Sequence, residues 1–192
     1  MTCDAGWVSS DRAVIPAWVV PDVLSVADAH RMTYRIFGDE RGRDRPARVR
    51  AGGAAAAIDW VTGGQPAPIT ERVEVDRDIA WAEWRLAGCI ERDRPMLWGE
   101  VEPREPVIRD RTWAVGAGDA LGWLLGAFSR PPVPLPRRLP DGSVPSAEHL
   151  YRERLALMPH TMWTPEQRQE AWQHAARDAQ RYRSLARLAD PI

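Results

Sequence analysis

The stretch AGGAAAAIDWVTG, residues 51–63, occurs a second time in altered form as AVGAGDALGWLLG, residues 114–126. Because alanine and glycine are common in these stretches, most of the identical positions are weak evidence for a repeat. The strongest evidence is the tryptophan pair together with the glycine that ends each stretch at the same position. The identical pairs are Ala51/Ala114, Gly53/Gly116, Ala54/Ala117, Ala57/Ala120, Trp60/Trp123 and Gly63/Gly126. We therefore predict a degenerate internal two-fold repeat over about 51–92 and 114–158.

Each copy has the spacing of a helix with one face of small and aliphatic residues. Positions i, i+3, i+4 and i+7 of that face are Ala54, Ala57, Ile58 and Val61 in the first copy, and Ala117, Ala120, Leu121 and Leu124 in the second. Small residues let a neighbouring helix approach to the short end of the usual ~8–10 Å separation. We expect helices at 51–62 and 112–125, each ended by a left-handed glycine. They should pack closely through Gly53, Ala54 and Ala57 against Gly116, Ala117 and Ala120, or each against the second helix of its own repeat.

Four further helices are predicted from capping residues and apolar spacing. The expected helices are 26–37 with Ser25 as N-cap and Asp28 closing its box, 77–92 after Asp76, 147–158, and 164–188 with Thr164, Pro165 and Gln167 at its start. No strand pattern competes with them, apart from short β-prone pieces near the N-terminus. The predicted fold is all-α, a bundle of about six helices forming a single domain over residues 1–192.

The remaining segments have compositions typical of irregular structure. Residues 1–24 contain Pro16 and Pro21 and are expected to form an extended arm laid over the core. We expect a solvated loop at 38–50 and an extended connector at 93–110, while 129–146 is predicted to be a Pro-rich loop.

The composition limits the possible functions. The 192-residue chain contains no lysine, so a Walker, Schiff-base or kinase lysine is excluded, and the arginine-only basic set is typical of a GC-rich genome. The formal net charge of −1, with arginines interleaved with acids, disfavours nucleic acid as a partner. The chain has two distant cysteines and no signal peptide pattern, which favours a cytoplasmic protein. It also has no run of 18 apolar residues, so we expect no membrane span.

The Pro-rich segment is the predicted partner-binding surface. It gains prolines and an aromatic residue relative to the corresponding segment after Gly63, and a polyproline-type arm loses little entropy on binding. The candidate partner-binding residues are Leu125, Phe128, Pro131, Pro132, Pro134, Pro136, Arg137 and Arg138. We expect a non-catalytic interaction, assembly or adaptor protein with a protein partner, no cofactor, and homo-oligomerisation left open. The segment is expected to be a docking surface rather than part of the core.

Two alternatives remain open. The first is a DNA-binding regulator that uses the two C-terminal helices and the arginines of the last one. The second is a metal-dependent enzyme whose ligands would be His149, Glu153, His174 and Asp178, two i, i+4 pairs on those helices. No nucleophile or phosphate-binding motif supports catalysis, so the sequence favours a protein that is not an enzyme.

Overall fold

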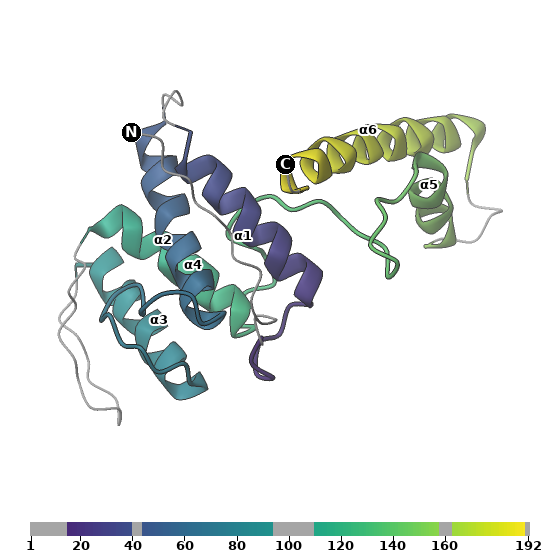
Figure 1. Ribbon diagram of the computed structural model, residues 1–192. Coiled ribbons are helices and arrows are strands. Elements are labelled where there is room, and N and C mark those ends of the chain that lie inside the picture. Colours follow the sequence, from purple (N-terminus) through teal and green to yellow (C-terminus); the bar gives the residue numbers. More distant parts are fainter. Residues whose placement is uncertain (1–14, 40–43, 94–109, 158–162, 191–192) are drawn as a thin grey trace.

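The computed structural model describes residues 15–39, 44–93, 110–157 and 163–190, and these ranges contain six helices and no strand (Figure 1). The helices are α1 (Val23–Phe37), α2 (Arg45–Val61), α3 (Arg77–Glu91), α4 (Arg111–Leu124), α5 (Ala147–Ala156) and α6 (Pro165–Ala189). The predicted all-α fold is confirmed. None of these helices has both the length and the apolar character needed to cross a membrane.

The helices are arranged as a cluster of four and a hairpin of two. Helices α1, α2, α3 and α4 pack together, with α2 and α4 in the most extensive contact (Figure 1). Helices α5 and α6 form a hairpin to one side, and α6 returns to contact α1 with its C-terminal end. Five of the largest fully buried side chains belong to the main core of the cluster: Trp60, Ile58, Ile69, Leu121 and Leu124.

The contact between α2 and α4 brings the two backbones together at two glycines. A Cβ built on Gly53 would overlap the carbonyl oxygen of Trp113, and a Cβ built on Gly116 would overlap that of Arg50. In each case the opposing carbonyl lies three residues before the other helix's glycine, so the two contacts are reciprocal. Only glycine permits this approach. The predicted close packing of the two quoted stretches is therefore present.

The ends of α2 and α4 also correspond. Gly63 and Gly126 have φ angles of 85° and 78°, and their N–H groups donate to the carbonyl oxygens of Trp60 and Trp123 at 3.0 Å. Beyond these ends the correspondence stops, because α3 packs against α4 whereas α5 packs against α6. The duplication itself stays a hypothesis, supported at α2 and α4 alone.

Two helix starts differ from the sequence-based expectation. The N-cap of α1 is Asp22, whose carboxylate accepts from the N–H of Ser25 at 2.9 Å, so the helix begins before the predicted Ser25 cap. Helix α2 begins at Arg45, within the predicted loop 38–50, with Asp44 as N-cap accepting from the N–H of Ala47. In both places an aspartate caps the helix at a position before the predicted start of that helix.

The segments outside the helices were predicted in part. Residues 15–22 are not helical, as expected for the arm, and Ile15, Trp18 and Val19 pack against the main core. Residues 1–14 of the predicted arm and 94–109 of the predicted connector lie outside the described residues. Thr164 and Gln167 form the predicted capping box of α6, and α5 ends at Ala156, two residues earlier than predicted.

A buried carboxylate on α3 fastens the loop that follows α2. Glu83 is 1% exposed and accepts a hydrogen bond from the Ile69 N–H at 3.1 Å and another from the Thr70 hydroxyl. Burial raises the pKa of Glu83, and these hydrogen bonds oppose that rise. Trp113 also holds the loop 66–72, since its indole N–H donates to the Pro68 oxygen at 3.2 Å, and Ala67 and Ile69 of this loop are buried in the main core.

This arrangement predicts a pH-dependent stability. Since the pKa of Glu83 is higher in the folded than in the unfolded state, its ionisation destabilises the fold as pH rises above the unfolded value through the folded one. Because only the wild type loses stability as Glu83 ionises, we expect the free energy of unfolding of Glu83→Gln minus that of the wild type to increase from about pH 4 to about pH 8. Denaturant unfolding measures this, with the exposed Glu74→Gln as control. A constant difference between Glu83→Gln and the wild type over this range would contradict it.

Candidate docking cleft

The end of α4 holds Phe128 in a fixed place at the surface. After the left-handed turn at Gly126, the Phe128 N–H donates to the Gly122 carbonyl oxygen at 3.0 Å and folds the chain back on the helix. The ring then lies over Gly122, where an added Cβ would be 2.6 Å from it. Glycine at position 122 is therefore required for the ring to lie this close to α4.

Two tryptophans of α3 support the Phe128 ring. It packs edge-on against Trp84, with ring centroids 5.8 Å apart, and Trp84 packs edge-on against Trp81 at 5.0 Å. Phe128 nevertheless remains 43% exposed. Because its neighbours restrict its motion, this aromatic surface would lose little conformational entropy on binding a partner.

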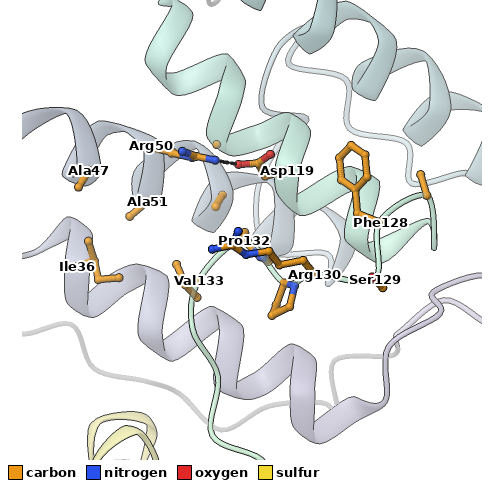
Figure 2. A pocket seen from close by; sticks show the side chains of 14 residues that line it. Ile36, Ala47, Arg50, Ala51, Asp119, Phe128, Ser129, Arg130, Pro132 and Val133 are labelled. Carbon is orange, nitrogen blue, oxygen red and sulfur yellow. Dashed lines mark hydrogen bonds and ion pairs between the residues drawn. The ribbon is translucent and has the colours of Figure 1, made fainter. Parts of the chain in front are cut away.

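Beside Phe128 lies a cleft of about 710 Å³ between the helix cluster and the start of the Pro-rich segment (Figure 2). It is lined by Ile36 of α1, by Ala47, Arg50, Ala51 and Ala54 of α2, by Gly116 and Asp119 of α4, and by residues 127–133. In Figure 2 Arg130 and Pro132 occupy the middle of the cleft, with the Arg50–Asp119 pair on one side and Phe128 on another. The volume lies within the range of ~300–1,000 Å³ typical of ligand sites.

Three charged side chains line this cleft. The Arg50 guanidinium donates to one carboxylate oxygen of Asp119 through Nε, at 3.0 Å, and also through Nη2. Arg130 is exposed and makes no hydrogen bond or ion pair within the described part of the chain. The lining therefore has two guanidinium groups and one carboxylate, and its net charge is positive.

The structure divides the predicted partner-binding residues into two groups. Phe128, Pro131 and Pro132 line the cleft, and Pro134 is exposed nearby. The other four have roles within the fold: Leu125 is buried in the main core, Pro136 is buried, Arg137 pairs with Glu153, and Arg138 pairs with Asp28. The sequence did not point to Arg50, Asp119 or Ile36, because only the packing of α1, α2 and α4 brings them beside the segment.

The second half of the Pro-rich segment is part of the packed fold, contrary to expectation. Val133 is buried in a small apolar cluster with Met32 and Ala189, against which Leu135 also packs. Arg138 binds Asp28, which is almost completely buried, at 2.5 and 3.0 Å. Within this segment, the surface available to a partner is therefore limited to about 128–132 and the exposed Pro134.

Arginines also fasten the C-terminal end of α6 to α1. Arg31 donates to the carbonyl oxygen of Ala189 at 3.1 Å, and Arg35 donates to that of Leu188 at 2.5 Å. Arg138 reaches Asp190 at 3.3 Å in addition to Asp28. Cations at the C-terminus of a helix interact favourably with its free carbonyl groups, so these contacts hold the hairpin to the cluster.

The residues of the metal-site alternative are not gathered at one place. His149 lies 3.2 Å from Glu153, but both carboxylate oxygens of Glu153 accept hydrogen bonds from Arg137. The Arg137 guanidinium therefore already pairs with the carboxylate that would bind a metal. His174 faces Glu170 at 3.9 Å rather than Asp178, and it lines a different pocket from Glu153 and Asp178. Within the described ranges, no three His, Cys, Asp or Glu side chains are grouped as metal ligands.

A polar cluster that the sequence did not reveal joins α1 to α2. His30 Nε2 lies 2.6 Å from one carboxylate oxygen of Asp59, and the Tyr34 hydroxyl donates to the other. Burial, with the hydrogen bond and negative charge of Asp59, raises the pKa of Tyr34 to about 12. Tyr34 therefore stays a hydrogen-bond donor at neutral pH, and the cluster stabilises the contact between the two helices.

Comparisons with protein-family models, with curated proteins and with solved structures give no match. The functional argument therefore depends on the geometry of the cleft and on the chemistry of its residues.

Proposed function

We propose that this chain is a non-catalytic interaction protein that holds a segment of a partner protein in the cleft beside Phe128. The observation that carries the proposal is an exposed aromatic ring held by packing against Trp84 and Gly122 at the edge of an open cleft. Aromatic and arginine side chains in such places carry most of the binding energy of protein interfaces. We also propose a cytoplasmic location, where a free thiol such as Cys89 stays reduced.

The chemistry of the cleft supports binding rather than catalysis. Its charged groups are two arginines and Asp119, which is paired with Arg50. The side chains that most often act as general acids or bases are His, Glu, Asp, Lys, Tyr and Cys, and the paired Asp119 is the one such residue in the described lining. The cleft does contain what recognition requires, namely apolar surface and a few placed polar groups.

The proposal predicts that Phe128→Asp abolishes capture of the native partner while the fold is retained. An exposed aspartate is tolerated in the folded state, but it introduces charge where an apolar contact is expected. The measurement is quantitative mass spectrometry of proteins that copurify from the native host, together with the melting temperature. Val73→Asp is the matched control, because Val73 is 79% exposed and does not line the cleft. Equal capture by both variants would contradict the proposal.

The DNA-binding alternative has one observation in its favour. Four arginines of α6 are exposed and make no ion pair with a described residue: Arg177, Arg181, Arg183 and Arg187. Contacts between such groups and phosphates would give retention on DNA that falls steeply with salt concentration. Retention that is absent at low salt would remove this alternative.

A further inference from the structure

The cleft has features that limit which partner segment it can hold, and the inference below depends on the proposed function. Arg130 carries a guanidinium without an ion pair to any residue that the structure describes, at the middle of a lining that is otherwise mostly apolar (Figure 2). Arg50 already donates two hydrogen bonds to Asp119. A carboxylate bound at Arg130 would balance the charge of the lining, and guanidinium groups bind carboxylates through two parallel hydrogen bonds.

The apolar part of the cleft lies close to Arg130 along the chain. Phe128 is two residues away, so the two Cα atoms are at most about 7 Å apart. Pro131 and Pro132 follow, and neither has a backbone N–H to donate. A partner strand cannot pair in register with this backbone, so recognition depends on side chains.

We propose that the occupant is a short acidic protein segment in which a carboxylate lies within one or two residues of an aromatic or aliphatic side chain. The apolar side chain packs on Phe128 and the prolines, and the carboxylate binds Arg130. Phosphate groups are usually bound by several hydrogen-bond donors at once, and the guanidinium of Arg130 is a single group. Charge and apolar surface together therefore favour a carboxylate-bearing peptide over a nucleotide.

The test is selection of a phage-displayed random peptide library on the full-length protein, followed by affinity measurement of synthetic peptides. We expect enriched sequences that pair Asp or Glu with a neighbouring aromatic or aliphatic residue. Arg130→Glu should weaken binding of the selected peptide about tenfold or more, as expected for a lost charge-assisted hydrogen bond. Arg177→Glu, which reverses an exposed charge on α6, should change the affinity less than about twofold.

Arg130 is exposed and has no ion pair with a described residue to lose, so Arg130→Glu is expected to fold, and its melting temperature verifies this. The reverse selection on Arg130→Glu should enrich Lys or Arg in place of the acidic residue. Enriched peptides that lack a carboxylate, or that bind Arg130→Glu as tightly as the wild type, would overturn the inference. So would the absence of enrichment, or a second copy of the chain in the cleft, detected as a dimer that Phe128→Asp dissociates.

The two proposals fail in distinguishable ways. If selected peptides require Phe128 but not Arg130, the cleft is a docking site and only the acidic character of the occupant is wrong. If peptides bind as predicted while Phe128→Asp leaves capture of the native partner unchanged, the proposed function is wrong and the peptide result describes a surface that the protein does not use.

Discussion

Gly116→Ala lowers the free energy of unfolding by about 3 kcal/mol or more, since overpacking costs ~1–3 kcal/mol and here the obstructing group is backbone. The new methyl group would overlap the carbonyl oxygen of Arg50, which cannot move without displacing α2. The melting temperature should fall by about 6–12 °C for a chain of this size. Gly53→Ala should behave alike, because its Cβ would overlap the Trp113 oxygen.

The matched control for this prediction is on the same helix. A Cβ at Gly118 would lie 3.4 Å from the Ala87 Cβ, an ordinary contact, so Gly118→Ala adds helix propensity without overlap. It should be neutral or stabilising by up to about 1 kcal/mol. Equal melting temperatures for Gly116→Ala and Gly118→Ala would show that α2 and α4 are further apart than described.

The second large effect is expected for Arg138→Ala. Removal of this side chain leaves the carboxylate of Asp28 buried, and among the described residues its remaining charged partner is the partly exposed Arg31 at 3.3 Å. Breaking a buried ion pair costs ~3–5 kcal/mol, and Arg31 should reduce this to about 2–3 kcal/mol. Denaturant unfolding measures the loss. Amide hydrogen exchange should show lost protection at the C-terminal end of α6, because Arg138 also contacts Asp190.

Arg137→Ala is the control for this effect. Arg137 and Glu153 are both 42% exposed, so their ion pair should contribute less than about 1 kcal/mol. Similar losses for the two variants would contradict the assignment of Arg138 to the fold. The comparison also tests the division of the Pro-rich segment into a first half open to a partner and a second half that is part of the fold.

The sequence was sufficient where the determining interactions are local. Asp76 and the Thr164–Gln167 box mark helix starts because a cap bonds to N–H groups within three residues of itself. Gly53 and Gly116 were identifiable because small residues at helical spacing favour close packing. The start of α2 lies inside the predicted loop: the density of charges from 38 to 50 favours a loop, although Asp44 and Pro46 are typical of a helix N-terminus.

The sequence was insufficient where distant residues meet. Asp28 and Arg138 are separated by 110 positions, and no pattern links them before the chain folds. Glu83 was not expected in the core, since a carboxylate is seldom buried without partners; its partners Ile69 and Thr70 lie in a loop. The buried face of α3 is accordingly Ala80, Glu83 and Ala87, whereas the larger apolar residues Ile79, Leu86 and Ile90 are half-buried.

The proposed function is tested most directly by locating the contact between the protein and its captured partner. A photo-cross-linking amino acid would be placed at Ser129, which lines the cleft, and in a second variant at the exposed Val73, which does not. After irradiation in cells of the native host, the account predicts a covalent adduct with one partner protein from position 129 and none from position 73. An adduct of equal yield from position 73, or a partner that cross-links only there, would contradict it.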